Sequence, residues 1–252
     1  MNTLWKWPHW GLCIIGLFSF VACRNSPKAI RSNNFGCTQI DSTISPKPAM
    51  EAMLAPYRLH MDSVMNDTVG YTTLPLSKAQ PECTAGNFIA DAQLWFAKQK
   101  NPKVQLSVMN YGGIRTPYIS PGALTRGKIY ELMPFDNKLS VVEIPGNVLH
   151  VFCDKMAASG GWPIAGFSYR IKNKKAVDIL VEGKEINPNF VYYTALSDYI
   201  ANGGDNCPFL LECKRVNYNA FVRDMMIGYL EMLKNQHQPL NVKLEKRVSY
   251  AE

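Results

Sequence analysis

The spacing of apolar residues predicts helices and strands from about residue 50 to the C-terminus. Apolar positions recur every three or four residues, which favours helices, in the ranges 50–67, 84–100, 146–159 and 221–236. Shorter apolar or alternating runs favour strands at 69–76, 103–110, 138–144, 167–171, 177–183, 190–196 and 242–250. Helices and strands are mixed without strict alternation, so the pattern predicts one α+β domain with a mixed sheet and flanking helices.

Two of these helices contain residues that indicate where the helix ends, starts or kinks. The clearest, 84–100, ends with Lys98 and Lys100, whose charges suit the negative end of a helix dipole. The helix at 50–67 contains Pro56, which lacks a backbone N–H, so this helix is expected to start or kink there.

Residues 1–48 differ in pattern from the rest of the chain. Residues 1–22 combine a short polar start with an apolar run, which is typical of a bacterial secretory signal, and "FVAC" resembles a lipoprotein box. We expect lipidation of Cys23, export from the cytoplasm and anchoring to a membrane of the cell envelope. An uncleaved anchor is the alternative, for which the apolar run is short. Residues 23–48, rich in Ser, Asn, Pro and Lys, predict a flexible tether, which leaves 49–252 as the single folded domain.

The charge of the chain narrows the choice of ligand. Its formal net charge is +7, but Lys and Arg are spread along the sequence rather than gathered on one element. Nucleic-acid binders usually cluster these residues, so no nucleic-acid partner is expected. The positive excess is compatible with a small anionic ligand.

The sequence lacks the common motifs of self-sufficient hydrolases. It has no P-loop, no GxSxG and no HExxH sequence. The DxH, GNH[DE] and GHxH elements of two-metal phosphoesterases are absent too, and His60, His150 and His237 are far apart. The cysteines show no paired zinc spacing, although Cys207 and Cys213 are close enough in sequence to form a disulfide. We therefore expect no metal, no bound cofactor and no catalytic residue in this chain.

Four loops carry unusual combinations of side chains. They are "PECTAGNFIADA" (81–92), "NYGGIR" (110–115), "MPFDN" (133–137) and "SDYIANGGD" (197–205). Taken singly, each is compatible with an ordinary turn, because turns commonly contain glycine. The turn in NYGGIR is expected to need the conformational freedom of glycine.

Taken together, the last three loops supply the parts of a nucleotide site. Two aromatics on separate loops, Phe135 and Tyr199, can stack on a base. Asp205 can accept hydrogen bonds from the two hydroxyls of a ribose, and Asn137 can pair with a base edge. Arg115 offers a planar bidentate donor for a phosphate or carboxylate.

Four ordered motifs carry a resemblance to a known family. "ECTAGNFIADA", "NYGGIR", "GKIYELMPFDNKLSVVEIPGNVL" and "YIANGGD" resemble the C-terminal substrate-binding domain of 5′-nucleotidases, the family that includes the UDP-sugar hydrolases. The resemblance covers about residues 50–252, and four motifs in order make it specific.

The resemblance implies a role for each motif residue. In that family two aromatics stack on the base; they match Phe135 and Tyr199, where the second is usually Phe. The asparagine that contacts the base matches Asn137, and the aspartate that holds the ribose matches Asp205. The NxGG[IV]R motif lies near the phosphate and matches Asn110, Gly113 and Arg115.

The resemblance also implies a second component. In the family, a separate N-terminal metallophosphatase domain carries two metal ions and performs the hydrolysis, whereas this sequence has its signal and lipid anchor at that place. A further substrate arginine is also replaced in "LSKAQPE", where Lys78 is the nearest cation, so a weaker grip on phosphate is expected.

Three functions are left open by the sequence. The favoured one is the nucleotide-recognising half of a split 5′-nucleotidase, a hydrolase that is not catalytic alone. A separate metallophosphatase chain would supply divalent metals for nucleotide catabolism. The alternative is a non-enzymatic exported lipoprotein that binds a nucleotide or nucleoside. A third is a surface lipoprotein that keeps the fold for partner contact only, which requires Phe135 and Tyr199 to be buried and to form no cleft.

Overall fold

The computed structural model describes residue 39 and residues 41–252. The predicted signal (1–22), the proposed lipidation site Cys23 and most of the predicted tether lie outside the described residues. Within the described part, no helix combines the length and the apolar character needed to cross a membrane.

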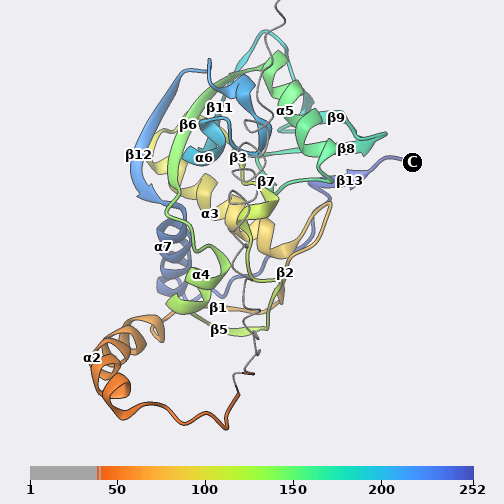
Figure 1. Cartoon of the computed structure of the whole chain (residues 1–252). Coiled ribbons are helices and arrows are strands. Elements are labelled where there is room, and N and C mark those ends of the chain that lie inside the picture. Colours follow the sequence, from red (N-terminus) through yellow and green to blue (C-terminus); the bar gives the residue numbers. More distant parts are fainter. Residues whose placement is uncertain (1–38, 40) are drawn as a thin grey trace, which may run out of the picture. The chain divides into compact units, whose positions relative to one another are not determined.

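A five-stranded mixed sheet forms the centre of the domain (Figure 1). Its strand order is β12 (Arg215–Phe221), β6 (Lys138–Pro145), β11 (Val191–Ser197), β3 (Val104–Val108) and β7 (Ile164–Ala165). Strand β11 runs parallel to β3 and antiparallel to β6. The C-terminal ends of β3 and β11 therefore lie at the same end of the sheet as the start of β6.

The sheet separates two hydrophobic clusters. Alternate residues of β6 point to opposite faces: Leu139 and Val141 join one cluster, and Val142 and Ile144 join the other. The first cluster is closed by α3 (Thr84–Lys100) and α7 (Val222–Asn235), which pack against each other. The second is closed by α5 (Gly146–Ala158) and a four-stranded sheet of β10 (Lys184–Glu185), β9 (Lys175–Val181), β8 (Phe167–Lys172) and β13 (Val248–Tyr250). Burial on both faces explains why apolar residues of β6 occupy both faces of the strand instead of alternating strictly with polar ones.

Short elements complete the domain around this centre. Two small antiparallel pairs join β1 (Thr68–Thr72) to β5 (Gly122–Thr125) and β2 (Leu76–Ser77) to β4 (Tyr118–Ile119). The short helical elements are α4 (Arg126–Leu132), α6 (Asp198–Ala201) and the 3₁₀ turns η1 (Tyr111–Gly113), η2 (Gly204–Asn206) and η3 (Pro208–Leu210).

The predicted α+β class is confirmed, and the helix predicted at 84–100 has the same bounds as α3. Several short elements were not predicted, and α4 and β12 are the longest of them. The seven-residue α4 is too short for a periodic pattern, although Thr125 caps it by accepting from the Lys128 N–H. Strand β12 lies at the edge of the sheet with half-exposed polar side chains, so it carries little apolar signal.

Two other expectations need correction. The strand predicted at 242–250 is formed only at Val248–Tyr250. Helix α2 (Pro48–Met65) runs through Pro56, so it does not start there; a kink at Pro56 stays a prediction. None of the residues of this helix is buried. The apolar face predicted for this helix is present, but side chains such as Tyr57 and Met61 are more than half exposed.

The fully buried Gln93 joins α3 to two central strands. Its Nε2 lies 3.0 Å from Ser107 Oγ, 3.2 Å from the Val108 carbonyl oxygen and 2.8 Å from the Ala195 carbonyl oxygen, and its two N–H groups are shared among these three acceptors. These acceptors lie near the C-terminal ends of β3 and β11. The side chain therefore ties the helix to the end of the sheet where the polar loops emerge.

Replacing Gln93 with Leu is expected to lower the free energy of unfolding by about 1–3 kcal/mol, because buried acceptors would lose their donor. Urea denaturation should show a lower midpoint with an unchanged slope. Gln99→Leu is the matched control, since Gln99 lies on the same helix but is exposed. Equal midpoints for the two variants would contradict the assigned role of Gln93.

Candidate functional site

A single cleft of about 380 Å³ forms where three central strands begin or end. Asn110 follows β3, Phe135 and Asn137 precede β6, and Tyr199 and Asp205 follow β11. The cleft is lined by Asn110, Gly112, Gly113, Arg115, Phe135, Asn137, Tyr199 and Asp205. The fold thus brings every predicted binding residue to one cleft, whose size suits a small molecule. Their roles in binding remain predictions.

The loop after β3 positions Arg115 through a tight 3₁₀ turn. The Gly113 N–H donates to the Asn110 carbonyl at 3.0 Å, and the Arg115 N–H donates to the Leu132 carbonyl at 3.0 Å. Neither glycine of the pair has a positive φ, so the expected need for conformational freedom is wrong. Space is the reason instead: a Cβ on Gly113 would lie 3.1 Å from Asn110 Oδ1.

The two predicted stacking aromatics are open to solvent. Phe135 is 40% exposed and Tyr199 is 45% exposed, and both line the cleft. The requirement of the third function, buried aromatics without a cleft, is therefore not met. The Arg115 guanidinium lies 5.6 Å from the centre of the Phe135 ring, within cation–π range.

The loop that carries Phe135 is held by the start of α7. Arg223 donates to the Phe135 carbonyl at 3.2 Å and forms an ion pair with Asp136. The Val222 N–H donates to the Asn137 carbonyl at 2.9 Å. Phe135 and Asn137 therefore project from a fixed backbone, which favours a preformed site.

A hydrogen-bond network links the other two loops at Asp205. Asn110 Nδ2 donates to Asp205 Oδ2 at 2.8 Å, and the Tyr199 hydroxyl donates to Asp205 Oδ1 at 3.0 Å. The Asp205 N–H donates back to the Tyr199 hydroxyl oxygen at 3.2 Å. The loop 197–205 contains a second glycine pair, Gly203 and Gly204. Gly204 must be glycine, because a Cβ there would lie 2.5 Å from the Tyr199 carbonyl oxygen.

The network leaves one buried acceptor without a partner. Asn110 is 6% exposed, and its Oδ1 has no hydrogen-bond partner among the described residues. Because a carboxylate oxygen only accepts, the amide atom facing Asp205 must be the nitrogen. Asn110 Oδ1 has almost no accessible surface, so the side chain contributes to the cleft mainly through the bond from its Nδ2 to Asp205.

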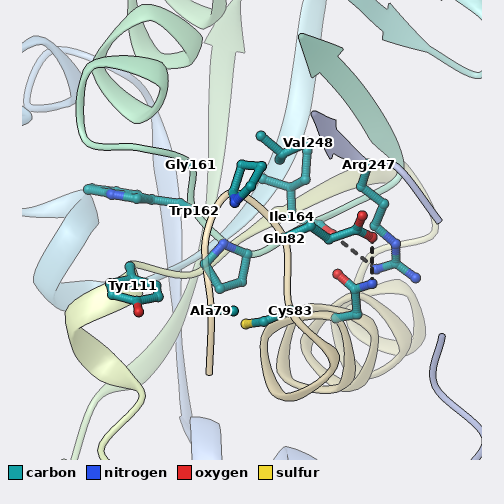
Figure 2. A pocket seen from close by; sticks show the side chains of 12 residues that line it. Ala79, Glu82, Cys83, Tyr111, Gly161, Trp162, Ile164, Arg247 and Val248 are labelled. Atoms are coloured by element: carbon teal, nitrogen blue, oxygen red, sulfur yellow. Dashed lines mark hydrogen bonds between the residues drawn. The ribbon is translucent and has the colours of Figure 1, made fainter. Parts of the chain in front are cut away.

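The fourth unusual loop, before α3, does not line this cleft. Asn87 Nδ2 donates to Glu82 Oε1 at 2.7 Å and to the Lys243 carbonyl at 2.9 Å, and the Cys83 sulfur accepts from the Gly86 N–H. Figure 2 shows Glu82 and Cys83 lining the same hollow as Trp162 and Arg247, and this hollow leaves no room for a water molecule. This motif therefore has a structural role, joining α3 to the C-terminal segment.

Lys78, the candidate substitute for the family's further arginine, supports the Arg115 loop. Its Nζ donates to the Ile114 carbonyl at 2.7 Å and lies 4.4 Å from the centre of the Tyr111 ring. It does not line the cleft, so Arg115 is the one cation among the lining residues.

The described residues contain no cluster of three or more His, Cys, Asp or Glu side chains that fits a metal ion. Cys207 follows the cleft loop, but burial raises the pKa of its thiol to about 11, so it stays protonated near neutral pH. Cys207 and Cys213, which are close enough in sequence to form a disulfide, are free thiols in the structure. The arrangement is suited to binding.

Sequence reasoning missed the contacts that position the site. The bond from the Tyr199 hydroxyl to Asp205 was not predicted, nor was the support that Arg223 gives to Phe135. The spacing of Tyr199 and Asp205 across a glycine pair is the signal that hinted at a folded-back loop. Nothing local in the sequence indicated Arg223.

Comparisons with known proteins agree with the geometry. The family model described as "5'-nucleotidase, C-terminal domain" matches residues 67–212, which include the whole cleft. A trifunctional nucleotide phosphoesterase of Bacillus subtilis is 27% identical over 237 residues, covering 86% of this chain and 16% of that protein. A 5′-nucleotidase of Vibrio parahaemolyticus is 26% identical over 214 residues, covering 81% of this chain and 36% of that protein. The crystal structure of a 5′-nucleotidase precursor from Thermus thermophilus matches with a TM-score of 0.70 and 26% identity, over 81% of this chain and 43% of that one. The chain thus spans less than half the length of these relatives.

Proposed function

Because the chain belongs to the 5′-nucleotidase C-terminal domain family, we propose that its cleft binds a nucleotide for hydrolysis by a metallophosphatase on a separate chain. The observation that carries this proposal is the set of side chains in the cleft: two exposed aromatics, two amides, a carboxylate and an arginine. Each has a counterpart in the chemistry of a nucleotide.

The base is bound mainly by stacking, whereas the ribose is bound by hydrogen bonds. The base stacks on Phe135 and Tyr199, at about 1–3 kcal/mol per stacked base, and Asn137 pairs with its edge. The ribose hydroxyls donate to Asp205. This acceptor is already fixed by the hydrogen bond from Asn110 Nδ2, so little ordering is needed on binding.

The phosphate is bound by the arginine loop. Arg115 provides two parallel N–H groups for phosphate oxygens, and Gly113 lines the cleft beside it. With Lys78 engaged by the Ile114 carbonyl, the phosphate is bound by one cation, so the preference for a monophosphate over a nucleoside is expected to be smaller than it would be with two cations.

Hydrolysis of the phosphate ester requires a group that activates water, such as a pair of metal ions. The described residues do not offer the donor set for such a pair. The metal ions and the reacting water are therefore assigned to the partner, a metallophosphatase that docks at the phosphate side of the cleft. This chain positions the substrate.

We place this reaction outside the cytoplasm, on a membrane of the cell envelope. The support for this is the pattern of residues 1–22 and the proposed lipid on Cys23. Nucleotide catabolism at the cell surface would then follow.

Calorimetry on the purified chain tests the binding role. AMP and adenosine are expected to bind with a stoichiometry of one, and AMP is expected to stay intact when Mn²⁺ or Zn²⁺ is added. Absence of binding for nucleotides and nucleosides of all four common bases would sink the proposal. Phosphate release by the chain alone would refute the division of labour between two chains.

A second candidate is a non-enzymatic exported protein that delivers a nucleotide or nucleoside to a transporter. The observation that favours it is that the cleft is complete within one chain. Calorimetry does not separate the two candidates, because both bind ligand. They are separated by whether a metallophosphatase makes the bound nucleotide react.

A further inference from the structure

The Tyr199 hydroxyl is engaged entirely by a neighbouring residue of the cleft. It donates to Asp205 Oδ1 at 3.0 Å and accepts from the Asp205 N–H at 3.2 Å. A phenol has one proton to donate, and that proton is used within the protein. The hydroxyl is therefore a support for Asp205 and offers a ligand no donor.

The carboxylate of Asp205 is fixed from both sides. Tyr199 bonds one oxygen and Asn110 Nδ2 bonds the other at 2.8 Å. Each carboxylate oxygen can accept about two hydrogen bonds, so one acceptor position on each stays free. Two fixed and adjacent acceptors match the two donors of a vicinal diol.

The backbone under Asp205 needs this support. Asp205 has φ 50° and Asn206 has φ 60°, so two successive non-glycine residues are left-handed. Such residues are held in place only when their surroundings over-determine them. The two hydrogen bonds between the Tyr199 hydroxyl and Asp205 hold this backbone conformation in place, together with the packing of Gly204 against the Tyr199 ring.

We propose that the Tyr199 hydroxyl is a positioning group that holds the Asp205 carboxylate for a vicinal diol and so sets the preference of the cleft for ribose over 2′-deoxyribose. This inference rests on the proposed nucleotide function. It separates two roles of one residue: the ring stacks on the base, and the hydroxyl acts on the sugar through Asp205. A phenylalanine at this position would keep the first role and lose the second.

The test compares a ribonucleoside with its 2′-deoxy counterpart by calorimetry. The probe is whichever of adenosine, guanosine, cytidine and uridine the wild-type chain binds most tightly, because a nucleoside isolates the sugar contact from Arg115. In Tyr199→Phe, the ratio of the two affinities is expected to fall roughly three- to tenfold, the range of one net hydrogen bond. The loss should fall on the ribonucleoside, with the deoxynucleoside nearly unchanged.

Phe135→Leu is the matched control, since it removes a stacking ring and leaves the Asp205 network intact. It should weaken both nucleosides equally and preserve their ratio. The proposal is overturned if Tyr199→Phe keeps or raises the wild-type ratio, or if the wild-type chain shows no preference for ribose. A wild-type chain that binds no nucleoside or nucleotide overturns the proposed function as well, so the two failures are distinguishable.

Discussion

Replacing Arg115 with Ala is expected to weaken AMP binding by about 1.5–3 kcal/mol, the range for hydrogen bonds to a charged group. Adenosine should lose much less, because it lacks the phosphate. Calorimetry on the wild-type and variant chains with both ligands measures the two losses. A larger loss for AMP than for adenosine assigns Arg115 to the phosphate.

The geometry explains why this loss should be large. The backbone of Arg115 is fixed by its bond to the Leu132 carbonyl, and its guanidinium has no carboxylate partner among the described residues. A guanidinium without an internal partner is free to bind an anion. Lys78 is held by the Ile114 carbonyl and is not a ready substitute.

Two further variants control this measurement. Lys184→Ala removes the same charge from an exposed strand outside the cleft, so it should leave both affinities unchanged. Arg115→Lys keeps the charge but loses the bidentate fork, and should recover only part of the AMP affinity. Equal losses for AMP and adenosine in Arg115→Ala would instead mean that the arginine is structural.

The sequence predicted the contents of the cleft better than the contacts that hold it. Asn110, Phe135 and Tyr199 each flank a strongly apolar strand, so local pattern alone set them at strand ends. That β3, β6 and β11 lie side by side is a long-range property that was not predicted; the family resemblance implied only that their loops share one site. The α+β class followed from the mixture of elements, which local periodicity does reveal.

The remaining features depend on side-chain geometry that no local pattern records. The Tyr199–Asp205 bond requires a left-handed Asp205, and the sequence "NGGD" shows only that the loop turns. Arg223 reaches the Phe135 loop from a helix that starts far away in sequence. The glycines of NYGGIR were assigned to backbone freedom, whereas the structure uses Gly113 for close packing on Asn110. A glycine can be required because a side chain would have no room or because the backbone has a positive φ, and only the three-dimensional structure distinguishes the two reasons.

Adding the metallophosphatase partner is expected to produce the largest change of all. The partner to use is an exported protein with DxH, GNH[DE] and GHxH motifs, supplied with Mn²⁺. Phosphate release from AMP by the mixture should exceed the sum of the separate proteins by about two orders of magnitude or more, because the chain holds the ester in place for the metal-bound water. Measuring phosphate release over a range of concentrations of this chain should give saturation.

The cleft variants decide whether such activity depends on substrate positioning. Asp205→Asn keeps the size of the side chain but weakens the acceptor pair, and should lower the rate of the mixture at low AMP concentration more than at saturating AMP. Gln99→Leu, on the exposed side of α3, should leave the rate unchanged. If the partner alone hydrolyses AMP as fast as the mixture, the chain is not half of an enzyme. A chain that still binds AMP in that case fits the role of a nucleotide carrier, because its cleft would bind without contributing to the reaction.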